Sequence, residues 1–540
     1  MVFSRILTMD TAGGIKGIQH AVASDTTIDI MLIGGGRQQI DEVEKMVIDK
    51  RKAGVLLPIF SLPGEYGIGT LGTHAYGFVD KLKAARQGYW QVLPQGPTSY
   101  GDSPYQSFST FAGNPYFIDL VKLIDQGLLM KWECDECYFG DNQNYIDYKA
   151  LYDTRLGLLK RAFDRADISQ DENYASFKKE NEFWLEDYAL YMAIKTDNGG
   201  VSWQEWQRPL KTRQPQALEN AGQRLSREVE FYRYIQFLFF EQWNRLKRYA
   251  NDSGIEIIGD LPIYVALDSA DVWANPELFH LDEDFAPIEV AGCPPDAFSM
   301  TGQLWGNPLY DWQQHTKTGF SWWLKRIKST LTMYDVVRID HFRGFDEYYA
   351  IPYGSETAER GVWKKAPGEE LFQAIKQQLG QARIIAEDLG VITPTVKSLL
   401  AKTGYPGMKV MQFAFYKGCN SDYLLHNHIK NSVVYTGTHD NRTSKGWFCD
   451  MSWIDKNYAG QYMGFATEEW DKNRFLRHVM SSPANLVIVP IQDYMELGDE
   501  ARINTPSTMG NNWKWRMSKG QFTPDICRYM AYITRLYFRE

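Results

Sequence analysis

Eight short apolar runs, many of them rich in β-branched residues, recur along the chain near positions 55, 89, 255, 333, 383, 408, 432 and 486. Runs of this kind, bounded by glycine or polar residues, predict strands that are buried on both faces, as in a parallel sheet. Segments with a helical spacing of apolar residues separate many of them. A closed parallel barrel needs eight strands, and closure leaves no sheet edge exposed. We therefore expect an α/β fold, a (β/α)8 TIM barrel.

Three of these runs end on a carboxylate: Asp340, Glu387 and Asp440. The C-terminal end of a barrel strand is where this fold places its chemistry. For a single strand, an acid that simply begins a loop is the simpler explanation. Three such strands, each with a second polar group beside its acid, favour a site. Glycosidic bond cleavage uses carboxyl groups in this way, one to attack or stabilise the sugar cation and one to transfer the proton.

The neighbours of these acids suit that chemistry. Arg338 lies two residues before Asp340, so on a strand both side chains point the same way, and a guanidinium lowers the pKa of a carboxyl group and orients its oxygens. An ordinary buried salt bridge explains Arg338 equally well. Glu387 follows apolar residues, and both burial and the charge of Asp340 would raise its pKa. Asp388 points the other way on an extended strand, and we expect it to be structural.

The charge and composition narrow the class of partner. The chain has 540 residues, with 58 Lys+Arg against 67 Asp+Glu, a net charge of −9. This mildly acidic balance argues against nucleic acid and anionic membranes as main partners. No apolar run approaches the roughly 18 residues that would span a bilayer. Aromatic residues make up 14% of the chain, which suits stacking on sugar rings, although a large aromatic core explains it equally well.

The sequence implies neither a metal nor an organic cofactor. Six cysteines are scattered along the chain, and Cys134 and Cys137 form a lone C-x-x-C with no matching second pair. A surface loop with free thiols is favoured over a zinc or redox site. The acids lack the spacing of an EF-hand, and the histidines lack that of a zinc site. The start of the chain lacks the apolar core of a signal peptide, so we expect a cytoplasmic protein.

Residues 1–45 fit nothing that follows, and we expect a leader that is disordered or loosely attached. It contains one apolar patch, Ile28–Ile33, followed by three glycines that no phosphate-binding motif surrounds. Residues 46–540 are expected to form the barrel, interrupted by a mostly helical insertion at about 121–250 and by loop insertions at about 265–330. The translation start is expected to lie close to Met46.

From about Lys52 to the C-terminus, the chain resembles the 4-α-glucanotransferases, also called amylomaltases or disproportionating enzymes, of glycoside hydrolase family 77. The motifs that carry the resemblance are long and occur in order. They include Gly101–Ser109, Gly259–Val265, Gly302–Pro308, Arg338–Gly344, Ala386–Gly390, Thr438–Asn441 and Asn512–Arg516. The resemblance implies a barrel with helical insertions. It also implies transfer of α-1,4-glucan segments from a donor malto-oligosaccharide, or a glucan derived from starch or glycogen, to the 4-OH of an acceptor.

The resemblance also assigns roles to residues. It implies that Asp340 is the nucleophile, Glu387 the acid/base and Asp440 the stabiliser of the transition state. Substrate-binding positions around these acids are implied for Tyr105, Asp260, Trp305, Arg338 and His439, with Trp305 in a loop that overhangs the acceptor side. Two residues depart from the family pattern, Arg442 after His-Asp-Asn and Ser507 where glycine is usual. Neither departure affects the three acids.

Two other functions are considered. An α-glucan hydrolase or debranching enzyme can share the barrel and the three acids, but the Gly302–Pro308 segment and the long family motifs argue against it. A non-catalytic glucan-binding barrel would need at least one of the acids replaced, and all three are present. We therefore expect a retaining transferase that acts through a covalent glucosyl ester.

Overall fold

The computed structural model describes residues 4–9, 15–21, 47–99, 101–295, 299–416, 418–464 and 469–540. The chain divides into two compact units, Met1–Lys45 and Met46–Glu540. In the first unit, β1 (Ser4–Met9) and β2 (Ile15–Ala21) pair as an antiparallel hairpin. The apolar patch at 28–33 and the glycines that follow it lie outside the described residues. The expectation that this leader is disordered or loosely attached stays a prediction.

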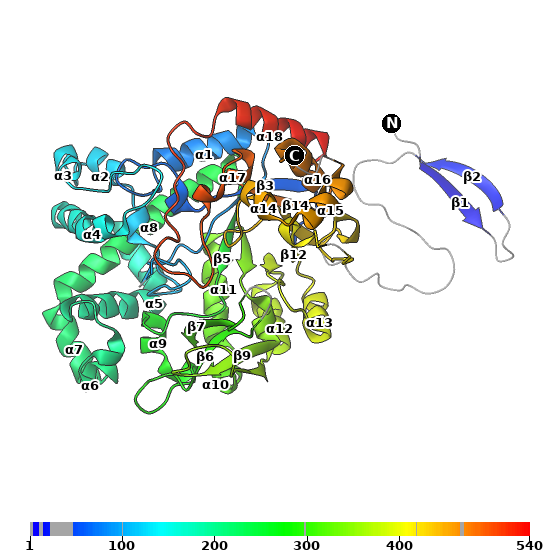
Figure 1. Ribbon diagram of the computed structural model, residues 1–540. Helices are drawn as coiled ribbons and strands as arrows, with labels where there is room; N and C mark the ends of the chain where they lie inside the picture. Colours follow the sequence, from blue (N-terminus) through cyan, green and yellow to red (C-terminus); the bar gives the residue numbers. More distant parts are fainter. Residues whose placement is uncertain are drawn as a thin grey trace. The chain divides into compact units, whose positions relative to one another are not determined.

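Eight parallel strands of the second unit close into a barrel (Figure 1). They are β3 (Lys52–Leu56), β4 (Tyr89–Gln91), β5 (Glu256–Leu261), β8 (Val336–Ile339), β11 (Ile384–Ala386), β12 (Gly407–Val410), β13 (Ser432–Tyr435) and β14 (Leu486–Pro490). Each strand pairs with its neighbours in chain order, and β14 closes the ring onto β3. The eight apolar runs are these eight strands, so the predicted (β/α)8 fold is confirmed.

The strand register brings the ends of the central strands into line. Ile339 of β8 pairs with Leu261 of β5 on one side and with Ala386 of β11 on the other. The next residues along β8 and β11 are Asp340 and Glu387, so both carboxylates leave the barrel at the same level. The apolar residues that make these strands buried therefore also place the acids side by side.

Helices surround the strands. Among the described residues, the α-helices are α1 (Thr73–Ala84), α2 (Leu120–Asp125), α3 (Lys131–Asp135), α4 (Tyr148–Arg165), α5 (Glu172–Asp197), α6 (Arg208–Lys211), α7 (Pro215–Arg224), α8 (Ser226–Asp252), α9 (Ala270–Ala274), α10 (Trp312–Lys317), α11 (Ser321–Met333), α12 (Gly368–Leu379), α13 (Pro394–Thr403), α14 (Ser444–Asp450), α15 (Trp453–Met463), α16 (Lys472–Met480), α17 (Ile491–Tyr494) and α18 (Pro524–Leu536). In the part of the chain that the structure describes, none is long and apolar enough to cross a membrane.

Seven helices, α2 to α8, lie between β4 and β5, where a mostly helical insertion is expected. The long helices α5 and α8 pack on each other, and α8 also contacts α1 and β5 of the barrel. Trp243 on α8 is fully buried and donates a hydrogen bond to the carbonyl of Met333, 3.1 Å away. Helix α8 therefore belongs both to the insertion and to the ring of barrel helices.

A second, antiparallel sheet is formed by segments inserted after β5 and after β8. Its strand order is β10-β9-β6-β7. The strands are β6 (Glu289–Cys293), β7 (Gln303–Pro308), β9 (Glu347–Pro352) and β10 (Val362–Lys365). The sequence pattern predicts only loop insertions at about 265–330, whereas β6 and β7 lie within that range. Trp305, expected in a loop, is a residue of strand β7.

Candidate active site

Arg338 and two aspartates form a buried ion-pair cluster at the end of β8. The Nη1 atom of Arg338 donates to both carboxylate oxygens of Asp260, each 2.7 Å away. Its Nη2 atom donates to Oδ1 of Asp340 at 2.8 Å. Burial opposes the charge of Arg338, but Asp260 and Asp340 together raise its pKa well above the ordinary value. The guanidinium therefore stays charged and orients one oxygen of Asp340.

Glu387 is held by backbone donors instead of a cation. Its Oε2 atom accepts from the backbone N–H of His341 at 2.7 Å, and its Oε1 atom from that of Leu389 at 2.8 Å. Burial, and then the charge of Asp340, raise the pKa of Glu387 to about 7. Asp388 accepts from the backbone N–H of Met408 on β12 at 2.6 Å, so it faces away from Glu387 and has a structural contact.

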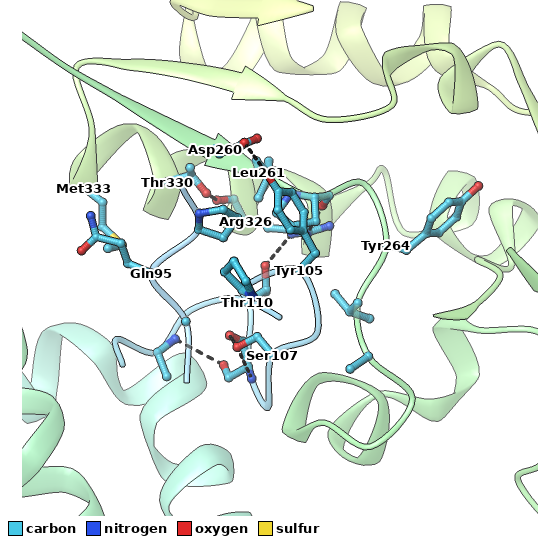
Figure 2. Close-up of a pocket in the computed structure, with 18 of the residues that line it drawn as sticks. Gln95, Tyr105, Ser107, Thr110, Asp260, Leu261, Tyr264, Arg326, Thr330 and Met333 are labelled. Atoms are coloured by element: carbon cyan, nitrogen blue, oxygen red, sulfur yellow. Dashed lines mark hydrogen bonds between the residues drawn. The ribbon is translucent and has the colours of Figure 1, made fainter. Parts of the chain in front are cut away.

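Tyr105 joins the ion-pair cluster to the third acid. Its hydroxyl donates to Oδ2 of Asp260 at 2.8 Å. Both residues line a small pocket of about 50 Å³, and Figure 2 shows this hydrogen bond. Its ring stacks on that of His439, with centroids 5.2 Å apart and planes at 17°. The ring of Trp513 packs against both, at 5.8 Å from Tyr105 and 5.9 Å from His439. These contacts form an aromatic wall beside Asp260.

Asp440 is more exposed than Asp340, with 44% of its side chain accessible against 29%. It lies in the loop after β13. Its Oδ1 atom accepts from Nδ2 of Asn504 at 2.6 Å and lies 3.4 Å from Nε2 of His439. The backbone carbonyl of Asp440 accepts from Nη2 of Arg502 at 2.6 Å. Asp440 therefore keeps its other carboxylate oxygen available for a ligand.

Trp305 contacts the site by packing its ring against that of His341. The two rings meet edge to face, with centroids 4.9 Å apart, and the indole Nε1 donates to Oε1 of Gln303 at 3.1 Å. His341 has a left-handed backbone conformation with φ of 53°. This turn aims its N–H at Glu387, and burial lowers the pKa of its imidazole to about 4. His341 is therefore neutral at physiological pH and does not neutralise the acids.

The eight residues expected at the site lie in one network of contacts. Six of them contact one another directly, and the other two, Glu387 and Trp305, contact His341, the residue that follows Asp340. Sequence reasoning missed four further residues of this network, His341, Arg502, Asn504 and Trp513. His341 and Trp513 lie in the motifs Arg338–Gly344 and Asn512–Arg516, which carry the family resemblance. None of the four ends a strand, so the pattern of strand-terminal acids gave no signal for them.

A polar cleft of about 1200 Å³ adjoins Asp440. It shares Arg502 and Asn504 with the contacts of that acid, and Arg442 and Tyr145 also line it. Arg442 is paired with Asp450 at 2.6 Å and with Asp499 at 3.0 Å. In the described part of the chain, no group of three or more His, Cys, Asp or Glu residues could hold a metal ion.

Comparison with known proteins decides the family. The sequence profile described as 4-alpha-glucanotransferase matches residues 57–522. The chain belongs to this 4-alpha-glucanotransferase family. It is 48% identical to the 4-alpha-glucanotransferase of Clostridium butyricum over 483 residues, which cover 89% of this chain and 99% of the relative. The enzyme of Thermus thermophilus is 48% identical over 486 residues, 88% of this chain and 96% of the relative.

A solved structure supports the same family. The amylomaltase from Streptococcus agalactiae in complex with acarbose has a TM-score of 0.88 and 43% identity, and covers 91% of this chain and 100% of its own. The match confirms the resemblance seen in the sequence motifs. The activity of this 4-alpha-glucanotransferase is therefore the transfer of α-glucan segments between α-glucan substrates.

Proposed function

We propose that this enzyme transfers α-1,4-glucan segments by a retaining double displacement in which Asp340 is the nucleophile and Glu387 the acid/base. The observation that carries the proposal is the contrast between two carboxyl groups on neighbouring strands. Asp340 is paired with Arg338, whereas Glu387 accepts its hydrogen bonds from backbone N–H groups and has a raised pKa. Carboxyl groups with opposite environments suit opposite roles in acid–base chemistry.

In the first step, Glu387 donates its proton to the glycosidic oxygen that leaves. Asp340 attacks the anomeric carbon, the bond to the leaving oxygen breaks, and a glucosyl ester forms on the carboxylate. Arg338 orients the attacking oxygen. Asp440 and His439 hold hydroxyl groups of the reacting sugar, with bonds that tighten as the ring flattens toward the transition state.

In the second step, Glu387 is ionised and takes the proton of the acceptor 4-OH. The acceptor oxygen attacks the same carbon from the opposite side to Asp340, the ester breaks, and Glu387 is protonated again. Two inversions leave the α configuration unchanged. Such a mechanism requires the carboxyl groups of Asp340 and Glu387 to lie roughly 5–5.5 Å apart, and a crystal structure with about 9 Å between them would point to inversion.

Transfer requires that a sugar hydroxyl outcompete water at the ester. Trp305 and His341 present an aromatic edge beside Glu387, which suits a bound acceptor ring and excludes water. The cleft beside Asp440 is large enough for several glucose units of a chain. Malto-oligosaccharides and glucans derived from starch or glycogen are the proposed substrates.

A product ladder from maltotriose tests the activity. Disproportionation gives glucose together with chains longer than maltotriose, whereas an α-glucan hydrolase or debranching enzyme gives mainly shorter sugars. A non-catalytic glucan-binding barrel gives no product. Glucose and maltose without any longer chain would overturn the proposal in favour of hydrolysis.

The nucleophile is tested by Asp340→Asn. We expect turnover to fall by many powers of ten, because the amide cannot form the ester, while folding and glucan binding stay nearly intact. The matched control is Asp335→Asn, which changes a carboxylate at the opposite end of β8. A variant at position 340 that keeps more than a small fraction of the wild-type rate would exclude Asp340 as the nucleophile.

A cytoplasmic location and the absence of nucleic-acid partners are further proposals that rest on the sequence. The net charge of −9 supports the second of them. Fractionation of cells that produce the full chain tests the first, and enzyme recovered chiefly outside the cytoplasmic fraction would contradict it.

A further inference from the structure

A fourth carboxylate follows a barrel strand, and the mechanism above does not use it. Asp493 lies on α17, directly after β14, and only 3% of the residue is exposed. Its Oδ2 atom accepts from the hydroxyl of Thr436 at 2.5 Å and from that of Ser444 at 2.7 Å. Its Oδ1 atom accepts from the backbone N–H of Ser444 at 2.7 Å. One buried side chain thus receives three hydrogen bonds.

These donors are the two ends of one loop. Thr436 is the first residue after β13, and Ser444 is the first residue of α14. The segment between them carries His439 and Asp440. Asp493 therefore binds both ends of the loop that presents the third acid of the site.

No cation shares this carboxylate. Among the residues that the structure describes, Asp493 is in no ion pair, and its three donors are neutral. Burial raises its pKa, and only the hydrogen bonds oppose this effect. A buried acid without a cation is costly. An ionised carboxylate has only acceptor sites, so this one side chain can accept hydrogen bonds from several donors at once.

Gln412, which follows the neighbouring strand β12, also binds the loop 436–444. Gln412 follows β12, is 5% exposed, and donates from Nε2 to the carbonyl of Arg442 at 2.8 Å. A Cβ atom at Gly437 would lie 2.6 Å from that Nε2, so the loop passes close to the amide, and a larger residue there would have to displace it. Asp440 itself is half exposed; it accepts hydrogen bonds from Arg502 and Asn504, and its backbone N–H donates to the hydroxyl of Thr438 in its own loop. Its position therefore depends on how its loop is held.

We propose that Asp493 is a positioning residue for catalysis, which clamps both ends of the loop 436–444 so that Asp440 and His439 face the reacting sugar. The inference rests on the proposed role of Asp440 in the transition state. A displacement of about 1 Å at a reacting group can cost on the order of 100-fold in rate. Loss of the clamp is therefore expected to act on kcat more than on KM.

The first test compares Asp493→Asn with Asp335→Asn. Asp335 is the control: its side chain also accepts hydrogen bonds, from the N–H of Ile257 and from Nδ2 of Asn251, both at 2.8 Å, and it pairs with Lys247 at 3.4 Å, but it lies at the N-terminal end of β8. With maltotriose as substrate, Asp493→Asn is expected to lower kcat on the order of 10- to 100-fold, with KM changed by less than about threefold. Asp335→Asn is expected to keep both constants. Equal losses of kcat in the two variants at equal melting temperature would overturn the inference.

A double-mutant cycle decides whether Asp493 acts through Asp440. Because the same loop carries His439, Asp493→Asn is expected to slow the Asp440→Asn enzyme too, but by a smaller factor than it slows the wild type. Multiplicative losses in the double variant would show an independent structural effect and overturn the inference while leaving the proposed function intact. A wild-type kcat for Asp440→Asn would overturn the proposed role of Asp440 as well.

Thr436→Val provides a second variant should Asp493→Asn fail to fold. It removes one hydroxyl donor and nearly conserves the shape of the side chain. Thr436→Val is expected to lower kcat less than Asp493→Asn does. In the Asp440→Asn background, the loss caused by Thr436→Val is expected to be smaller than in the wild type. An unchanged kcat in Thr436→Val would contradict the clamp.

Discussion

At the scale of single residues, the chemistry depends on giving two similar carboxyl groups different surroundings. Asp340 receives a guanidinium N–H, whereas the hydrogen bonds to the carboxylate of Glu387 come from backbone N–H groups. The two acids are also coupled, because the charge on Asp340 helps to keep Glu387 protonated. In the proposed mechanism, Asp340 is thereby ready to attack and Glu387 ready to donate a proton.

This coupling predicts the pH dependence of the first step. Glu387 must be protonated to assist the leaving oxygen, and its pKa is raised to about 7. The rate is therefore expected to fall as the pH rises through about 7, and the activity measured from pH 5 to 9 checks this. With a glucosyl fluoride donor, whose leaving group needs little protonation, Glu387→Gln is expected to lose this alkaline limb. A wild-type profile that stays flat up to pH 9 would contradict the assignment.

The strand-end pattern predicts the three acids and Arg338, because a strand fixes where its last side chains point. It does not predict His341, whose N–H reaches Glu387 only through a left-handed turn. Nor does it predict Asn504, which contacts Asp440 from a distant loop. Ser507 has φ of 61°, a conformation that favours glycine, so the structure gives a physical reason why glycine is usual at this position.

At the scale of elements, the barrel can be predicted because buried parallel strands have a local signature. The antiparallel sheet β10-β9-β6-β7 has none, since its short strands come from two separate insertions. Gly292 illustrates the difficulty: a Cβ atom there would lie 2.2 Å from the carbonyl oxygen of Gln303 on β7. The reason for a glycine in β6 is thus a contact with another strand, which local sequence patterns do not reveal.

The closure of the barrel between β14 and β3 depends on Arg539. This residue is fully buried, and donates to the carbonyls of Met480 at 2.8 Å, Ser482 at 2.6 Å and Lys52 at 3.2 Å. Arg539→Leu would remove a donor from each of these carbonyls, of which Ser482 and Met480 would keep only their bonds from Arg51, at 2.8 and 3.4 Å, and we expect it to lower the free energy of unfolding by about 3 kcal/mol. Chemical denaturation measures this, with the exposed Arg535→Leu on α18 as control. Equal stability of the two variants would contradict the proposed closure.

At the scale of the whole molecule, the unit boundary after Lys45 falls where the sequence changes character. The family match also begins beyond it, at residue 57. We therefore predict that residues 1–45 are dispensable. A chain that begins at Met46 is expected to melt within a few degrees of the full chain and to disproportionate maltotriose at a similar rate. An insoluble or inactive truncated chain would show that the leader is a structural part of the enzyme.

The central claim of this account is that the glucan segment passes through an ester on Asp340. In Glu387→Gln enzyme treated with α-maltosyl fluoride, the ester forms readily but lacks the base that speeds its breakdown, so it accumulates. Peptide mapping by mass spectrometry is predicted to find the added mass of one maltosyl group on the peptide that contains Asp340. In the double variant Glu387→Gln, Asp340→Asn, no maltosyl adduct is expected. An adduct on a different carboxylate, or turnover with inverted configuration and no adduct, would contradict the account.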